Sequence, residues 1–413
     1  MQPKRQPAGR PLNPAWQPQS CLIGAMPPAA MALLEQLPAI LEQVWPLSRA
    51  HRRQLPADIR DLSAMLTSQR SELRFNYWTK PNFISAYLYY FLPWNLVRLC
   101  RLLPQLPLPA PPANALLADA GSGPLTLPLA LWLARPEWRP APVRVLAMDA
   151  SRQPLELGLK LFAAMANKAG QQSWRLHGAA GPLEALAGRQ PPDCQPWLVA
   201  AANVLNELKP GKYEDAAGDR FERLLQAWQP LWQNGGQLLF IEPGTRLGGA
   251  LIMRMRAAGL AAGLYPLAPC THFGDCALEK QNGNEESERL PSGWCHFVFS
   301  AQDAPAWLKA LSQEARLCKT SLSLSLILLA KSRPETPSEA LPVRVISQSF
   351  LAQMSVARYG CAACGLTLLR NSKNAVSGSL CAGQKPSHAK RDAKSGALIL
   401  EPCPQSQRSS RRQ

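Results

Sequence analysis

Apolar residues recur at helical spacing between residues 29 and 110. One stripe consists of Leu33, Leu34, Leu37, Ile40, Leu41 and Val44, and a second of Ile59, Leu62 and Leu66. Residues three and four positions apart share one face of a helix, so the spacing predicts an N-terminal helical region. Its aromatic part, residues 75–95, also carries Lys80, Asn82 and Asn95. Such rings usually form core, but rings among amides and cations also stack on bases or cover a cofactor.

Short apolar runs alternate with helix-spaced segments through residues 111–335. We expect strands at residues 116–119, 143–149, 174–176, 197–201 and 237–241, and residues 321–330 have the strongest strand pattern. This alternation predicts a parallel sheet with helices on both faces. The expected fold class is therefore α/β, a doubly wound, Rossmann-type sheet.

The first predicted strand runs into a glycine-containing loop. Asp119, Gly121 and Gly123 follow the apolar run, and a helix is expected to begin at Pro124. Glycines let the backbone approach a bound nucleotide, and the start of the helix offers N–H donors. Thr126 stands where a dinucleotide site has a third glycine, which argues against NAD. The D-x-G-x-G pattern resembles the first motif of class I S-adenosylmethionine-dependent methyltransferases; the alternative is a strand-turn-helix corner without a ligand.

Polar residues follow the second and fourth predicted strands. Asp149 ends the second strand, where an acid accepts hydrogen bonds from ribose hydroxyls in nucleotide-binding sheets; the alternative role is a charge at the start of a helix. Asn203, Asn206 and Glu207 follow the fourth strand, at the edge where open α/β sheets place ligands. These residues would contact a cofactor or a methyl acceptor. In the alternative, Asn203 stabilises a turn and Glu207 is an acidic residue at the start of a helix.

Cysteines gather in residues 266–297, which interrupt the alternation. Cys270, Cys276 and Cys295 lie there in polar, loop-like sequence beside His272 and His296. Thiolates are ligands for zinc or an iron–sulfur cluster, and a full set requires four. The spacing fits neither a zinc ribbon nor a ferredoxin, so it does not identify the metal. The alternative is that these cysteines are thiols that bind no metal.

A fourth ligand is offered by the C-x-x-C pair Cys361 and Cys364, in a small module at residues 341–370. The chain has 11 cysteines but no export signal, because the basic start MQPKRQPAGRP lacks an apolar segment. Reduced thiols or metal ligands are therefore expected rather than disulfides.

The net charge of +17 and the pI near 9.7 favour a polyanionic partner, above all nucleic acid, over an acidic small molecule. The alternative is a merely basic surface. Residues 1–28 are basic and Pro-rich, and residues 370–413 carry nine Lys and Arg against Asp392 and Glu401. We expect a disordered arm at 1–28 and a disordered, phosphate-binding tail at 371–413.

No apolar segment reaches the length that spans a bilayer. The closest, residues 84–103, is interrupted by Pro93, Arg98 and Arg101. A soluble protein without a membrane partner is therefore expected.

An ordered set of motifs carries a more specific resemblance. DAGSGP, VLNEL, IEPGT, APC-x5-C and WCHF, followed by the late cysteine module, resemble the ribosomal small-subunit-associated methyltransferase-like family of bacteria and mitochondria over roughly residues 30–370. The resemblance implies a class I methyltransferase fold at residues 111–335 with the inserted cysteine segment. It also implies association with the assembling small ribosomal subunit through its rRNA. We further expect a cytoplasmic, monomeric protein.

The resemblance assigns roles to individual residues. S-adenosylmethionine would be held by Asp119, Gly121, Gly123 and Asp149. A [4Fe-4S] cluster, with zinc as the alternative, would be held by Cys270, Cys276, Cys295 and Cys361, with Cys364 the alternative fourth ligand.

Two functions from different classes follow. One is methyl transfer to rRNA, with Asn203 and Glu207 as the catalytic candidates, because transfer requires mainly alignment of donor and acceptor. The N-P-P-Y type motif of several base methyltransferases is missing, however, and ANVLNEL stands in its place. The other function is a catalytically inactive RNA-binding assembly scaffold, stabilised by a metal cluster.

Overall fold

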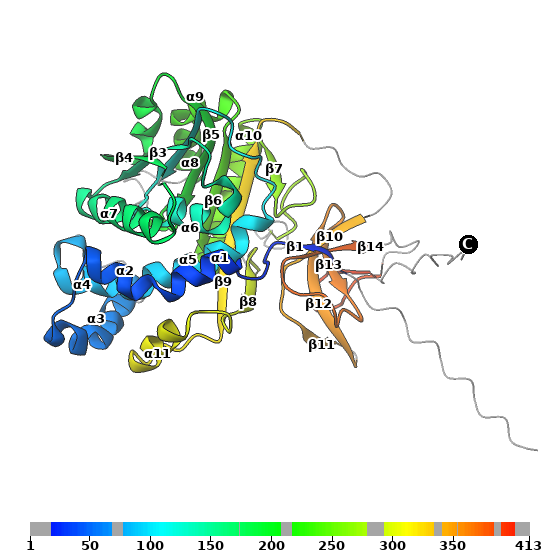
Figure 1. The fold of residues 1–413 in the computed structure, drawn as a ribbon. Helices are drawn as coiled ribbons and strands as arrows, with labels where there is room; N and C mark the ends of the chain where they lie inside the picture. The colour runs from blue at the N-terminus through cyan, green and yellow to red at the C-terminus, as the bar shows by residue number, and fades with distance from the viewer. Residues whose placement is uncertain are drawn as a thin grey trace, which may run out of the picture. The chain divides into compact units, whose positions relative to one another are not determined.

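The structure is a computed structural model that describes residues 18–67, 77–172, 174–207, 217–278, 293–333, 341–352, 354–383 and 390–400. The chain forms two compact units. Leu22–Glu335 make up the larger unit, and Met1–Cys21 together with Thr336–Gln413 make up the smaller one. In Figure 1 the larger unit is a sheet covered by helices, and the smaller unit is built from strands.

The N-terminal part of the larger unit is helical, as the spacing of apolar residues predicts. It contains α1 (Pro28–Glu35), α2 (Leu37–Val44), α3 (Arg49–Thr67) and the 3-10 turn η2 (Tyr77–Thr79). A nearly continuous helix follows, formed by α4 (Pro81–Ala86), the π-helical turn η3 (Tyr87–Phe91) and α5 (Leu92–Leu102), and η4 (Leu103–Gln105) ends it. The apolar stripe of α1 and α2 is buried except for its last residue, the half-buried Val44.

A mostly parallel sheet forms the centre of the larger unit. Its order is β4-β3-β2-β5-β6-β9-β7. Strands β2 (Ala115–Ala120), β3 (Arg144–Asp149), β4 (Arg175–Ala180), β5 (Gln195–Ala202) and β6 (Gln237–Pro243) are parallel, and β9 (Ser321–Ala330) is antiparallel to β6. The order reverses between β2 and β5, where doubly wound sheets bind ligands. The predicted strands and the class I methyltransferase-like fold are thus confirmed.

Helices cover both faces of this sheet. On one face α6 (Thr126–Ala134) packs against α5, and α7 (Arg152–Lys168) packs against α2. On the other face α8 (Ala217–Ala227), α9 (Gln229–Gln233) and α10 (Arg246–Ala261) lie with the 3-10 turn η6 (Leu183–Arg189).

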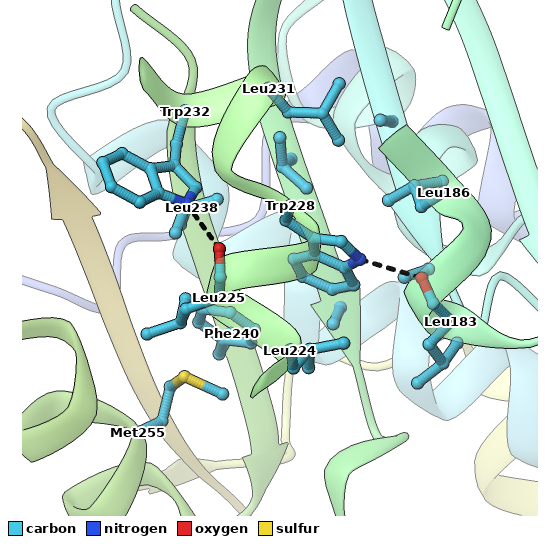
Figure 2. Packing of buried hydrophobic residues seen from close by; sticks show 14 of the residues in the cluster. Leu183, Leu186, Leu224, Leu225, Trp228, Leu231, Trp232, Leu238, Phe240 and Met255 are labelled. Atoms are coloured by element: carbon cyan, nitrogen blue, oxygen red, sulfur yellow. Dashed lines mark hydrogen bonds between the residues drawn. The ribbon is translucent and has the colours of Figure 1, made fainter. Parts of the chain in front are cut away.

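The core of this second face is centred on two tryptophans (Figure 2). The Trp228 ring lies parallel to the Phe240 ring, with 5.9 Å between centroids, and its Nε1 donates to the Leu183 carbonyl at 2.8 Å. Trp232 Nε1 donates to the Leu225 carbonyl at 2.9 Å. Both indole N–H groups are therefore satisfied inside the core.

Two short strands share the edge of the sheet beside β9. β7 (Tyr265–Ala268) pairs with the end of β9, and β8 (Phe297–Ser300) pairs with its beginning. The cysteine segment connects these two strands, and α11 (Ala306–Glu314) then leads from β8 into β9. The strands that flank the expected insertion at 266–297 thus lie at the edge of the sheet, and residues 279–292 of the insertion lie outside the described residues.

The smaller unit contains a seven-stranded sheet in the order β1-β14-β10-β12-β13-β15, with β11 paired to β12. The strands are β1 (Pro18–Cys21), β10 (Leu341–Val345), β11 (Phe350–Ala352), β12 (Ser355–Ala362), β13 (Gly365–Leu369), β14 (Ser379–Gly383) and β15 (Leu398–Leu400). Its buried core includes Val343, Val345, Leu369, Cys381 and Leu400.

This sheet corrects the expected limits of disorder. Pro18–Cys21 lies in the arm expected at 1–28, and β14 and β15 lie in the tail expected at 371–413, so disorder was wrong for these strands. β14 lies between β1 and β10, and the pairing partners are far apart in sequence, which local periodicity does not reveal. Residues 1–17 and 401–413 lie outside the described residues.

Among the described helices, none has both the length and the apolar content required to cross a bilayer.

Candidate functional site

The loop between β2 and α6 combines two glycines with a left-handed backbone. Gly121 has φ +66° and Gly123 has φ +53°, so a side chain at either position would be strained. A Cβ at Gly121 would also overlap Val204, which follows β5. A Cβ at Gly123 would meet nothing within 4 Å. The loop therefore packs closely on the end of β5 at Gly121 and leaves open space at Gly123.

Asp119 stabilises this loop through a buried hydrogen bond. Its side chain is buried, 1% exposed, and its Oδ2 accepts a hydrogen bond from Ser122 Oγ at 2.5 Å. Burial raises the pKa of Asp119 to about 7; the nearby Asp149 carboxylate also raises it and the Ser122 hydroxyl opposes the shift. Asp119 thus orders the loop rather than facing solvent.

Asp149 ties the end of β3 to the same loop. Its Oδ2 accepts from the Gly123 N–H and its Oδ1 from the Ser151 N–H, each at 2.9 Å. Burial raises the pKa of Asp149, and the two backbone donors oppose that shift. The residue is half-buried, and a carboxylate oxygen that accepts one bond can accept another. The structure therefore brings Asp119, both glycines and Asp149 together at the carboxyl edge of the sheet.

The start of α6 differs from the expectation. The helix begins at Thr126 rather than at Pro124, because Leu125 adopts a left-handed conformation with φ +57°. The Thr126 N–H donates to the Ser122 carbonyl at 3.2 Å, and Pro128 has no N–H. The first turn of this helix thus offers fewer N–H donors than the sequence suggested.

A polar cluster lies where β5 ends. Asn203 has φ +61°, and its Oδ1 accepts from Arg98 Nη2 at 2.7 Å. The same Nη2 donates to Asn95 Oδ1 at 2.9 Å, and Arg98 Nη1 donates to the Ser323 carbonyl at 3.3 Å. Arg98 is 7% exposed, so α5 places a buried guanidinium between two amides. Burial lowers the pKa of Arg98 to about 10, against the opposing effect of Glu242.

Glu242 orders the chain after Asn203. It lies on β6 and is fully buried, and its Oε1 accepts from the Leu205 N–H at 2.8 Å. This bond fixes the 3-10 turn η7 (Leu205–Glu207). The predicted catalytic residue Glu207 ends that turn, but its side chain lies outside the described residues.

Sequence reasoning missed Arg98 and Glu242 as members of the site. Both had a visible signal. Arg98 is a charge within an apolar helix, and Glu242 directly follows a buried strand. A buried charge requires a partner, so each marks a place where polar groups meet.

A second buried arginine organises the cysteine segment. Arg256, on α10, is 3% exposed, and its Nε donates to Cys270 Sγ at 3.3 Å. Its Nη2 donates to the carbonyls of His272, at 3.3 Å, and Gly274, at 2.5 Å. Burial and the Arg256 charge lower the pKa of His272, while the Gly274 backbone and Asp275 oppose the shift.

The predicted metal ligands are placed on different parts of the chain. Cys276 is buried, and Cys270 and Cys295 are half-buried, all in the larger unit. Cys361 lies on β12 and Cys364 in the following turn, both in the smaller unit. Among the described residues, no group of three or more His, Cys, Asp or Glu side chains is arranged to hold a metal ion.

A sequence profile of one family, the mitochondrial small ribosomal subunit protein Rsm22, matches residues 82–366. The chain belongs to the Rsm22 family. The match begins in α4, includes the whole sheet of the larger unit, and ends in β13, so the loop, the polar cluster and the cysteine segment are all parts of the Rsm22 region.

Relatives match over a shorter stretch. The mitochondrial Rsm22-cox11 tandem proteins 1 and 2 of Schizosaccharomyces pombe are each 33% identical to the chain over 95 residues. That stretch covers 21% of this chain and 12% of each relative. The chain therefore spans only a small part of the length of these relatives.

Solved structures with some similarity are methyltransferases. A putative class I S-adenosylmethionine-dependent methyltransferase from Listeria monocytogenes is 11% identical, with a TM-score of 0.30, covering 75% of this chain and 90% of that one. A precorrin-6Y methyltransferase from Geobacter metallireducens is 10% identical, with a TM-score of 0.30, covering 53% and 80%. Strand order and connectivity, not these alignments, establish the fold of the Rsm22-family chain.

Proposed function

We propose that this protein associates with the small ribosomal subunit and binds its rRNA. The observation that carries the proposal is membership of a family described as a small ribosomal subunit protein, over residues 82–366. The net charge of +17 supports it, because a cationic surface attracts the phosphate backbone. A direct test is sedimentation of the purified chain with isolated small-subunit particles. Migration with the particles at moderate salt is expected, and a chain that stays at the top of the gradient would contradict the proposal.

The glycine loop is proposed to bind S-adenosylmethionine. Open space at Gly123 and the half-buried Asp149 at the reversal of strand order fit a nucleoside there. Asp149 would accept hydrogen bonds from the ribose hydroxyls. Asp119 would stabilise the conformation of the loop. Once bound, S-adenosylmethionine supplies an electrophilic methyl group.

The donor site can be tested by equilibrium dialysis with S-adenosylmethionine. Asp149→Ala should abolish binding, whereas Asp193→Ala removes an exposed carboxylate that pairs with Arg144 and should leave binding unchanged. If Asp149→Ala abolishes binding while small-subunit maturation continues in cells, catalysis is not the essential activity and the scaffold role is favoured.

The polar cluster favours the scaffold role over methylation of an exocyclic amine. An asparagine that assists such a reaction uses its amide oxygen to hold the amine hydrogens. In this chain Asn203 Oδ1 accepts from the Arg98 guanidinium, which takes one of the two acceptor positions of that oxygen and, as a cation, opposes the positive charge that develops on an attacking amine. We therefore infer that recognition of RNA, rather than activation of an amine, is the main task of this edge.

A metal centre is proposed for the cysteine segment, with Cys270, Cys276, Cys295 and Cys361, or Cys364 in its place, as ligands of a [4Fe-4S] cluster. The supporting observation is the Arg256 guanidinium beside Cys270 Sγ, since thiolate ligands occur next to positive charge. The donor set suits iron–sulfur chemistry or zinc. The described residues do not by themselves form a metal-holding group, so the proposal rests on the donor chemistry.

Protein purified without oxygen should therefore be analysed for iron, acid-labile sulfide and zinc, with its absorption spectrum. Cys270→Ser and Cys361→Ser should remove the metal, and Cys318→Ser, an exposed cysteine outside the segment, is the matched control. Zinc in place of iron would keep the ligand set and change its chemistry. Protein without metal after reconstitution would contradict the centre.

A further inference from the structure

A half-exposed stripe interrupts an otherwise buried helix. From Phe83 to Cys100, along α4, η3 and α5, the half-buried residues are Tyr87, Phe91 and Asn95, and all others are buried. They are four residues apart, so they lie along one face of the helix. The π-helical turn Tyr87–Phe91 lies within the stripe, and π-turns occur frequently at functional sites.

The aromatic part of the stripe is stacked. The Tyr87 ring lies 6.0 Å from the Phe91 ring and 6.1 Å from the Tyr77 ring, both stacked, and 4.7 Å from the Trp78 ring. Rings that are half-exposed and already held by neighbours offer faces to a planar ligand with little loss of conformational entropy. A nucleobase is such a ligand.

The amide part of the stripe is oriented by Arg98. A guanidinium carries only donors, so the oxygens of Asn95 and Asn203 must face it. The Nδ2 groups of both amides are consequently turned away from Arg98, and neither donates a hydrogen bond to a described residue. Both residues are half-buried, so these N–H donors remain accessible.

A cation lies beside this edge. Lys319 Nζ is 5.8 Å from the Tyr90 ring centroid and 6.0 Å from the Trp94 ring centroid. Lys319 is exposed at the surface, and partial desolvation together with the neighbouring Arg98 lowers its pKa. No ion pair joins Lys319 to an acid among the residues that the structure describes. A phosphate is the group that two neighbouring cations attract.

We propose that Tyr87, Phe91, Asn95 and Asn203 form a subsite for one unpaired RNA base that presents hydrogen-bond acceptors, with Arg98 as its positioning residue. The base stacks on the two rings, its carbonyl oxygens accept from the two amides, and Lys319 contacts the adjoining phosphate. Because the amide oxygens are held by Arg98, the subsite prefers a carbonyl to an amino group at the same position. Uracil is therefore preferred over cytosine. The proposal rests on the proposed binding of rRNA.

The test measures fluorescence anisotropy with labelled octauridylate and octacytidylate on the full chain. The wild-type chain should bind octauridylate more tightly than octacytidylate. Tyr87→Leu and Phe91→Leu should each weaken both probes about tenfold, as expected for the loss of one stacking contact. Phe83→Leu, a buried ring on the same helix, is the matched control for folding and should leave binding unchanged.

The Arg98→Met variant tests whether Arg98 orients the two amides or only stabilises the fold. It frees both amide oxygens, so the preference for uridylate over cytidylate should vanish even where overall affinity changes little. A folded Arg98→Met chain that keeps the wild-type ratio between the two probes would overturn the role of Arg98. Circular dichroism and thermal melting show whether the variant is folded, and Asn203→Asp, which keeps an oxygen toward Arg98 and removes the amide donors, should abolish the same preference in a folded chain.

Cosedimentation with small-subunit particles distinguishes the two proposals. If the wild-type chain does not migrate with particles, the proposed function is wrong. If it does, and the ring variants bind octauridylate as tightly as wild type, the subsite alone is wrong. If the ring variants lose S-adenosylmethionine and keep RNA, the rings cover the cofactor, and that outcome also overturns the subsite.

Discussion

Gly121 and Gly123 share a left-handed backbone but have different surroundings. An alanine at either position carries the cost of that conformation, about 1–2 kcal/mol. At Gly121 it would also overlap Val204, which adds about 1–3 kcal/mol. We predict that Gly121→Ala lowers the free energy of unfolding by about 3 kcal/mol and Gly123→Ala by about half as much. Urea denaturation measures both, and adding Val204→Ala should recover stability only in the Gly121 variant.

The two variants should rank in the opposite order for binding of S-adenosylmethionine, with Gly123→Ala the more strongly impaired. The open space at Gly123 is where a nucleoside would approach the backbone, so Gly123→Ala should weaken S-adenosylmethionine more than its small loss of stability explains. Equal losses of stability, or unchanged binding by Gly123→Ala, would contradict this account of the loop.

Asp119 makes stability depend on pH. Its folded-state pKa, about 7, lies above the value of an unfolded aspartate, so the folded state binds the extra proton between pH 4 and 7. This contribution is fully present at pH 4 and declines as the pH rises to 7, by up to about 1.4 kcal/mol per pH unit. Thermal melting from pH 4 to 8 should show that Asp119→Asn removes it. Asp193→Asn is the control, because Arg144 lowers the pKa of that exposed acid and its effect lies at lower pH.

At the level of elements, Trp228, the residue between α8 and α9, connects these helices to η6. Its indole donates to the Leu183 carbonyl in η6, whereas Trp232 donates to Leu225 in α8 (Figure 2). Trp228→Phe would remove the indole hydrogen bond to the Leu183 carbonyl, and we predict a loss of about 1 kcal/mol in the free energy of unfolding. Hydrogen exchange should become faster in Leu183–Arg189 for Trp228→Phe and not for Trp232→Phe. Equal exchange in the two variants would show that η6 is held by other contacts.

The elements that the sequence predicted are those with local signals. Strand β9 was expected at residues 321–330 and occurs there, because a run of alternating apolar residues needs no distant partner to be recognised. The Asp119–Gly123 loop was located for a similar reason, since glycine spacing is local. The strands of the smaller unit were underestimated, because β1 becomes a strand only by pairing with β14. The start of α6 was misplaced because the left-handed Leu125 follows from the packing of the loop.

In the polar cluster, too, the sequence predicted the local features and not the contacts between distant residues. The end of β5 and the polar residue Asn203 were predicted, but the partner of its amide was not. Arg98 precedes Asn203 by 105 residues, and only the packing of α5 near the carboxyl edge brings their side chains to 2.7 Å. The sequence showed a charge inside an apolar helix, which indicated that a buried partner was required without naming it.

At the level of the whole molecule, residues 371–413 carry eight Lys and Arg against two acids, a net +6 of the chain's +17. Deleting residues 371–413 would remove β14, which lies between β1 and β10, so that deletion tests folding as well as RNA binding. Deleting residues 401–413 removes Arg408, Arg411, Arg412 and Glu401 while leaving every described strand in place. Comparison of the two truncations therefore distinguishes the effect of losing strands of the sheet from the effect of losing positive charge.

We predict that the chain lacking residues 401–413 melts at the temperature of the full chain and binds small-subunit rRNA more weakly at low salt. Each phosphate contact contributes about 0.7–0.9 to the slope of log K against log salt, so losing three arginines should flatten that slope by up to about 2–3. Replacing the three arginines by glutamine in the full chain should give the same slope. The chain lacking residues 371–413 should instead melt at a lower temperature. An unchanged slope in the shorter truncation would place the phosphate contacts on the folded units.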